Sequence, residues 1–159
     1  MLLDPKEVND FLTGYKALIC DSFGSVPDDL ESWVVGRDKM LQQIQQGDLS
    51  QGNEVSNEWK GRIDNVVSGK FIFLKRYKFY CAMQNMDSSL YYAVRSLTTP
   101  LEEMIAEFSI VETCLIPYKG MFVCDGLVVA NNIHLGKNLV KDVRDGFWEA
   151  RRSSSLIGA

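Results

Sequence analysis

The stretch Gly69-Lys70-Phe71-Ile72-Phe73-Leu74 decides the fold class, because the spacing of the hydrophobic residues changes there. Before this stretch, apolar residues recur every three or four positions, which is typical of helices. After it, apolar and polar residues alternate, as they do in β-strands with one buried face. The four apolar residues at 71–74 indicate a strand that is buried on both faces or that closes a small barrel.

The residues before the change predict a helical part that covers 1–68. A capping box at Asp4-Pro5-Lys6-Glu7 starts the first helix, since Asp4 can accept a backbone N–H and Pro5 fits the first helical position. A second helical stretch follows Pro27 and Asp28, and because Gly36 interrupts it, either one helix or two shorter helices are expected there. A third helix is expected around Trp59, ending at Ser68-Gly69.

The residues at 69–130 predict antiparallel strands with one short helix at 100–108, and a C-terminal helix is expected over 137–152. Helices that are segregated from strands in this way indicate an α+β fold. We therefore expect N-terminal helices, an antiparallel five-stranded meander or small partly open barrel, and a C-terminal helix. The length of 159 residues is compatible with one domain, 1–159.

Composition excludes several classes of protein. No apolar run approaches the ~20 residues that cross a bilayer, so we expect no membrane partner. An acid at the fourth position comes too early for a secretory signal, so a cytoplasmic protein with reduced thiols is predicted. The 17 basic and 21 acidic side chains give a net charge of −4.

Motifs for metal, cofactor or catalytic chemistry are missing from the sequence. The four cysteines have no C-x-x-C spacing and the chain has one histidine, so we predict no metal site. No phosphate-binding glycine motif and no nucleophile elbow occurs, so no cofactor is predicted. The sequence favours a non-catalytic binding or interaction domain. Its partner would be a protein or a small ligand, and exposed tyrosines at 91, 92 and 118 would also allow a homodimer.

Four residues near the predicted hairpin are the candidate ligand-binding residues: Tyr118, Lys119, Asp125 and His134. An alternative is a small cysteine- and histidine-dependent enzyme with a site near Cys124, Asp125 and His134, which requires the thiol and the imidazole to lie within about 3 Å. The simpler interpretation is that Cys124 packs in the core, Asp125-Gly126 bends the chain, and His134 lies near the surface.

A second alternative is weak binding of single-stranded nucleic acid. The candidate residues are Lys70, Lys75, Arg76 and Lys78, which alternate with aromatic residues. Basic and aromatic side chains together hold phosphates and stack on bases. The net charge of −4 opposes this alternative and disfavours nucleic acid as a partner, and the same residues could instead protect a sheet edge.

Several segments resemble a poorly characterised bacterial family. The most specific of them are Val111-Glu112-Thr113-Cys114-Leu115-Ile116-Pro117-Tyr118-Lys119-Gly120 and Asp125-Gly126-Leu127. Members of that family sometimes precede a cysteine-rich metal-binding tail of the SEC-C type. The resemblance implies a bacterial, intracellular origin but no activity, cofactor or catalytic residue. Because this sequence carries no cysteine-rich tail, no metal-dependent role is carried over.

Overall fold

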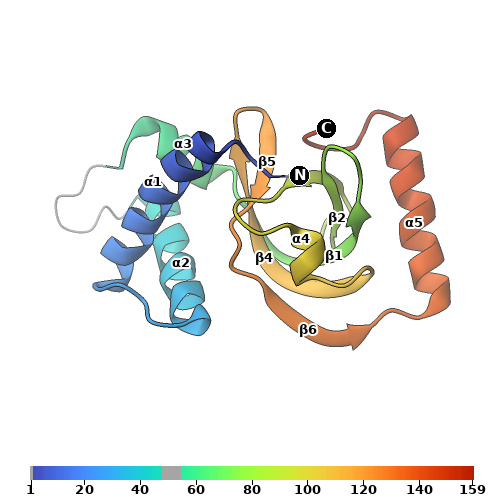
Figure 1. Cartoon of the computed structure of the whole chain (residues 1–159), viewed down its shortest axis with the longest axis horizontal. Helices are drawn as coiled ribbons and strands as arrows, with labels where there is room; N and C mark the ends of the chain where they lie inside the picture. The colour runs from blue at the N-terminus through green and yellow to red at the C-terminus, as the bar shows by residue number, and fades with distance from the viewer. Residues whose placement is uncertain (1, 48–54) are drawn as a thin grey trace. The chain divides into compact units, whose positions relative to one another are not determined.

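A computed structural model describes residues 2–47 and 55–159. The chain forms two compact units (Figure 1). The helical unit covers Asp4–Val66, and the barrel unit covers Val67–Ala159 together with the first residues of the chain. That 1–159 behaves as one domain stays a prediction. No helix of the described residues is long and apolar enough to cross a membrane, while a cytoplasmic location stays a prediction.

The described residues of the helical unit form three helices: α1 (Pro5–Phe23), α2 (Leu30–Gln45) and α3 (Asn57–Asp64). Each helix begins after a side chain that accepts a hydrogen bond from a backbone N–H, namely Asp4, Asp29 and Ser56. Such caps satisfy donors that have no partner within the helix. The predicted start of the first helix is therefore confirmed, and α2 runs through Gly36 without a break.

An aromatic cluster holds α1 and α3 together within the helical unit. The ring of Phe11 lies 5.4 Å from that of Tyr15 and 5.3 Å from that of Trp59, centre to centre. Gly14 allows this approach, because a Cβ there would lie 2.4 Å from the Trp59 Nε1. Phe11 is fully buried, so aromatic area in this unit is used for packing.

The barrel unit contains six strands and two helices: β1 (Val67–Arg76), β2 (Cys81–Asn85), β3 (Tyr91–Arg95), α4 (Leu101–Met104), β4 (Ser109–Tyr118), β5 (Met121–Cys124), β6 (Val129–His134) and α5 (Lys137–Arg152). The predicted C-terminal helix is confirmed. The first strand begins at Val67, so Gly69 lies inside β1 and does not end a helix. The helix expected at 100–108 is shorter, because Ile105 already has an extended backbone.

Five of the strands close into a barrel. The order is β1-β2-β3-β5-β4, and β4 pairs back with β1. All pairs in this ring are antiparallel except β3 with β5. With α4 between β3 and β4, this is the strand order of the OB-fold, a Greek-key barrel. The α+β class is confirmed, but the barrel is closed and mixed where an antiparallel meander or partly open barrel was expected.

The order of the elements along the chain explains why the barrel closes. α4 separates β3 from β4 in the chain, so β4 can pair with β1 instead of β3, and the β4–β5 hairpin then brings β5 beside β3 in the parallel direction. Local alternation is the same for parallel and antiparallel neighbours, and so the sequence did not reveal this pair. β6 is a sixth strand, which pairs with β4 outside the ring.

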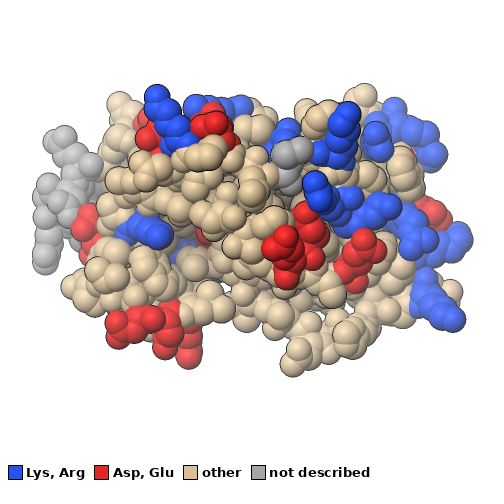
Figure 2. Space-filling view, in the orientation of Figure 1, with Lys and Arg blue, Asp and Glu red and all other residues tan. Residues whose placement is uncertain are grey.

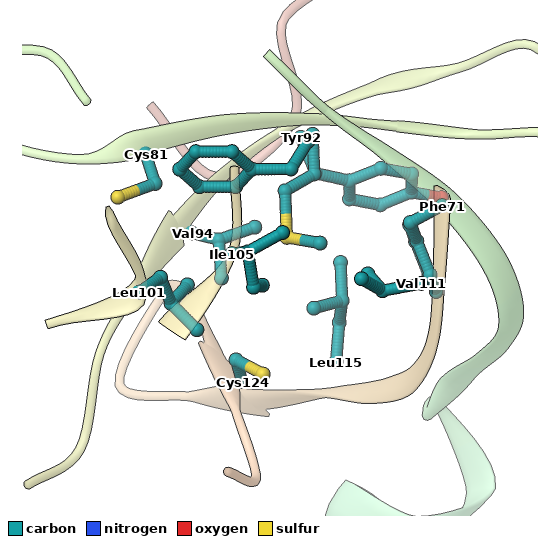
Figure 3. Close-up of a cluster of buried hydrophobic side chains, with 11 residues drawn as sticks. Phe71, Cys81, Tyr92, Val94, Leu101, Ile105, Val111, Leu115 and Cys124 are labelled. Atoms are coloured by element: carbon teal, nitrogen blue, oxygen red, sulfur yellow. The ribbon is translucent and has the colours of Figure 1, made fainter. Parts of the chain in front are cut away.

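β1 is buried on both faces, as its apolar run predicts. Phe71 and Phe73 belong to the barrel core, whereas Ile72 and Leu74 belong to a second cluster outside the barrel. Figure 3 shows the barrel core, in which Leu101 and Ile105 from the α4 segment pack against residues of the strands. Successive side chains of β1 therefore point alternately into two hydrophobic clusters.

α5 covers the outer face of β1, β2 and β3 (Figure 1). Val143, Phe147 and Ala150 of this helix pack against that face. The Tyr91 hydroxyl donates to the Val143 carbonyl at 2.8 Å. A Cβ at Gly146 would lie 2.3 Å from the Tyr91 hydroxyl oxygen, so glycine is needed for the close approach. The face on which OB-folds commonly bind their ligands is thus occupied by the chain itself.

Candidate binding site

Basic and aromatic side chains of the barrel unit line one cavity or lie over the rings beside it, and Lys78 and Phe79 follow directly in the chain after Tyr77 of that cavity. We name this set the basic aromatic surface and define it by the residues Lys75, Tyr77, Lys78, Phe79, Phe108, Arg144, Trp148 and Arg151. They come from the end of β1, the β1–β2 connection, the segment before β4, and α5. Figure 2 shows Lys and Arg side chains gathered around α5. No single element could supply this surface.

Cations lie over the rings of this surface. The Lys75 Nζ is 5.3 Å from the centre of the Tyr77 ring, and the Arg144 Cζ is 5.3 Å from that of Phe108. The Arg151 Cζ is 5.9 Å from the Tyr77 ring and 5.2 Å from the Trp148 ring. These distances lie within the range of cation–π attraction, which orients the side chains without neutralising their charge.

Two rings of the surface are unusually exposed. Phe79 is 55% exposed and Trp148 is 39% exposed. The Trp148 ring nevertheless has a defined position, because it packs edge-on against Tyr77 at 6.2 Å and against Phe147 at 5.5 Å. An oriented, exposed ring is available for stacking on a ligand.

A cavity of about 130 Å³ opens within this surface. Its lining residues are Leu74, Lys75, Tyr77, Glu107, Phe108, Arg144 and Trp148. Burial raises the pKa of the Tyr77 hydroxyl, and the nearby Tyr80 raises it further, against the opposing charges of Arg151 and Arg144. Tyr77 is therefore a neutral hydrogen-bonding group at ordinary pH, and the charges of the cavity come from the two cations and Glu107.

The backbone of Phe108 has a conformation that bulky residues seldom adopt. Its φ is +57°, in the left-handed region. The Phe108 N–H donates to the Phe73 carbonyl at 2.6 Å, which fixes this conformation on β1. Conformations of this kind cost about 1–3 kcal/mol and occur often at functional sites.

The hairpin residues proposed from the sequence lie elsewhere in the barrel unit. Lys119 and Gly120, at φ 49° and 77°, form the β4–β5 turn, and Lys119 lies over the Tyr118 ring at 5.3 Å. Tyr118 is only 4% exposed, and Tyr91 and Tyr92 are buried too, so these rings are not exposed as expected. Tyr91 lies under α5 and Tyr92 packs in the barrel core.

Asp125 stabilises its own turn. The buried Asp125 carboxylate accepts from the Leu127 N–H at 2.9 Å and from the Thr113 hydroxyl at 3.3 Å. His134 lies on β6, exposed and paired with Ser109 of β4. The structure therefore uses Asp125 to shape the chain after β5, and it does not bring the four hairpin candidates into one cavity.

Cys124 and His134 are also far apart. Cys124 pairs with Leu115 and His134 with Ser109, six residues away along β4, which is about 20 Å at the rise of a strand. Cys124 is 1% exposed, and its sulfur lies 3.3 Å from the Thr113 hydroxyl. The register thus separates the thiol and the imidazole that the enzyme alternative needs.

The four basic residues proposed from the sequence separate into two groups. Lys75 and Lys78 lie on the basic aromatic surface, and the Lys78 Nζ is 5.0 Å from the Phe79 ring. Arg76 instead forms an ion pair with Glu102 at 3.2 Å, and Lys70 pairs in register with Glu112 of β4. The pairing of β1 with β2 shifts register between Phe73 and Lys75. A bulge of this kind changes the direction in which the side chains after it point.

Sequence reasoning missed the part of the surface that α5 supplies. Arg144, Trp148 and Arg151 recur at spacings of four and three, which places them on one helix face beside the buried face of Val143 and Phe147. That spacing was a usable signal. The conformation of Phe108 had no signal, because left-handed backbone usually predicts glycine or asparagine.

Metal-ligating residues do not converge in the part of the chain that the structure describes, where no group of three or more His, Cys, Asp or Glu could hold an ion. Comparison with known proteins adds no assignment: no protein-family model, no curated protein and no solved structure matches the chain.

Proposed function

We propose that the protein is a non-catalytic binding domain and that its barrel unit binds an anionic ligand through the basic aromatic surface. One observation carries the proposal: two exposed rings each lie beside a cation, Phe79 beside Lys78 and Trp148 beside Arg151. Exposed aromatic and cationic side chains in one place favour ligands with negative charge and apolar or planar parts. The separation of Cys124 from His134 supports binding without chemistry.

The charge of each unit supports an anionic ligand. Residues 67–159 contain eleven Lys and Arg against nine Asp and Glu, a net charge of +2, whereas 4–66 contain six against twelve, a net charge of −6. The chain's total of −4 therefore comes from the helical unit and says little about the barrel unit. The proposal does not depend on three other predictions, which stay proposals: a cytoplasmic location, a homodimer and membership of the bacterial family that the sequence resembles.

Single-stranded nucleic acid is the second candidate, favoured by the combination of +2 charge and exposed rings on the barrel unit. Titration with fluorescein-labelled oligothymidylate and with labelled heparin, at low and moderate salt, tests both candidates. Both polyanions should bind at low salt and weaken as salt rises. Oligothymidylate should bind more tightly, since its bases can stack on the rings.

Matched variants assign the binding to the surface. Lys78→Gln and Arg151→Gln together should weaken polyanion binding by about tenfold, in line with the loss of two phosphate contacts. Arg76→Gln is the control, because this basic residue is ion-paired with Glu102. Failure of both polyanions to bind would remove the proposed function. Equal binding of heparin and oligothymidylate would remove only the nucleic-acid candidate.

A further inference from the structure

We propose that the cavity lined by Leu74, Tyr77, Phe108, Arg144 and Trp148 binds one planar ring of a ligand whose anionic group lies on Arg144 and Lys75. This inference rests on the proposed function and names the ligand chemistry of its surface. The ligand class is a ring joined to a phosphate or carboxylate, of which a nucleoside monophosphate is the simplest example.

The size of the cavity sets how much of the ligand enters. About 130 Å³ is far below the roughly 300 Å³ or more of sites that enclose a whole small molecule. It is close to the ~150 Å³ of a cavity that holds one benzene ring. One ring therefore fills the cavity, and the remainder of the ligand lies on the surrounding surface.

The walls suit a flat ring. Phe147 stacks on Tyr77 at 5.0 Å and so supports the Tyr77 side of the cavity from beneath. Trp148 meets Tyr77 edge-on, and Phe108 is held under Arg144. Because each wall ring is fixed by a neighbour, little conformational entropy is lost when a further ring inserts. Stacking of this kind contributes about 1–3 kcal/mol for a nucleobase.

The charges suit an anion attached to the ring. Lys75 and Arg144 line the cavity together with one carboxylate, Glu107, and Arg151 lies just outside over Trp148. Two cations at the lining and a third beside it exceed the single acid. Glu107 adds an acceptor that could take a hydrogen bond from the ring edge. An uncharged ring would contact only the aromatic walls, and an anion without a ring would contact only the cations.

A second, independent feature is the left-handed backbone of Phe108. The conformation places an aromatic ring between the barrel and α5, at a position where asparagine or glycine would be free of strain. The hydrogen bond to Phe73 holds the strained backbone in place. We therefore expect Phe108→Asn to relieve the backbone strain and to weaken ligand binding, while the loss of the Phe108 ring from the cluster of Leu74 and Phe147 opposes the gain in stability.

NMR titration of the full chain with uridine monophosphate tests the inference. The indole N–H signal of Trp148 should shift, whereas those of Trp33 and Trp59, which belong to the helical unit, serve as internal controls. Uridine and ribose phosphate, which each lack one half of the ligand, should bind at least about tenfold more weakly, a difference of about 1.4 kcal/mol. Equal affinity of either fragment would overturn the inference.

Variants and a longer ligand complete the test. Arg144→Gln should weaken binding of uridine monophosphate about tenfold, whereas Arg152→Gln, on the same helix and paired with Glu149 at 2.9 Å, should leave it unchanged. Oligothymidylate can be compared with uridine monophosphate by the concentration at which each shifts the Trp148 indole signal. If oligothymidylate acts at a much lower concentration, the ring that enters the cavity belongs to a single strand. If both act at the same concentration, the ring belongs to a free small ligand. Polyanion binding without any Trp148 shift would refute the inference and leave the proposed function standing.

Discussion

The two units of the chain use the same residue types in opposite ways. In the helical unit, the rings of Phe11, Tyr15 and Trp59 pack together, and acids outnumber bases by twelve to six. In the barrel unit, Phe79 and Trp148 are exposed among cations, and the net charge is +2. The aromatic content and the net charge of the whole chain therefore describe neither unit, and the proposed binding surface can be recognised only when the charge and the exposed rings of each unit are considered separately.

The largest expected effect is the loss of stability when a core phenylalanine of either unit is replaced. Phe73 in the barrel core and Phe11 in the helical unit are both fully buried. Substitution of either by alanine should lower the free energy of unfolding by about 3–5 kcal/mol, because a large cavity is left. Urea denaturation followed by Trp148 fluorescence in variants with a single tryptophan reports the barrel unit, and Trp59 reports the helical unit.

These two variants also test the single-domain prediction. If residues 1–159 unfold as one domain, either substitution should shift the transition seen by both tryptophans to the same extent. A Phe73→Ala protein in which Trp148 responds and Trp59 keeps its original midpoint would contradict that prediction, and the two units would then be separate domains.

The fold was largely predictable where the information is local. The apolar run at 71–74 correctly predicted a strand with two buried faces, and the capping box at Asp4 correctly predicted the start of α1. The closing β1–β4 pair and the parallel β3–β5 pair were not predictable from this reasoning. Both depend on which distant strands meet, and alternation within a strand carries no record of its neighbour.

The candidate site was predictable only in part, for the same reason. Lys75 and Lys78 were identified from one continuous stretch. Their partners Arg144 and Trp148 lie on α5, almost seventy positions later, and are brought to the surface by the packing of Phe147 on β1. The hairpin residues were proposed because polar groups were close in sequence, but Asp125 is used within its own turn.

The second effect concerns a buried thiol in the barrel core. Burial raises the pKa of Cys81 from 9.0 to about 11, with a further increase from Glu102, whose carboxylate lies 3.7 Å away. The unfolded chain therefore loses this proton at a lower pH than the folded chain. Stability from the neutral thiol is present below pH 9 and is lost as the pH rises from 9 to 11.

Urea denaturation of the wild type and of Cys81→Val at pH 7 and pH 11 measures this effect. The wild type should lose up to about 2–3 kcal/mol more than the variant between these values, since each unit of pKa shift corresponds to about 1.4 kcal/mol. The difference at pH 7 is the control for the change in packing. Parallel losses in both proteins would show that the Cys81 thiol ionises as readily in the fold as in the unfolded chain.

The smallest expected effect compares one helical glycine from each unit. At Gly146 of α5 a Cβ would lie 2.3 Å from the Tyr91 hydroxyl oxygen, whereas at Gly61 of α3 it would meet open space. Gly146→Ala should therefore destabilise the barrel unit by about 1–3 kcal/mol through overpacking and loss of the Tyr91–Val143 hydrogen bond. Gly61→Ala should stabilise the helical unit by about 0.5–1 kcal/mol, because alanine favours helices.

Since α5 carries Arg144 and Trp148, Gly146→Ala should also weaken binding of uridine monophosphate. A stabilised Gly146→Ala protein with unchanged affinity would show that α5 need not lie close to β3 for the surface to form.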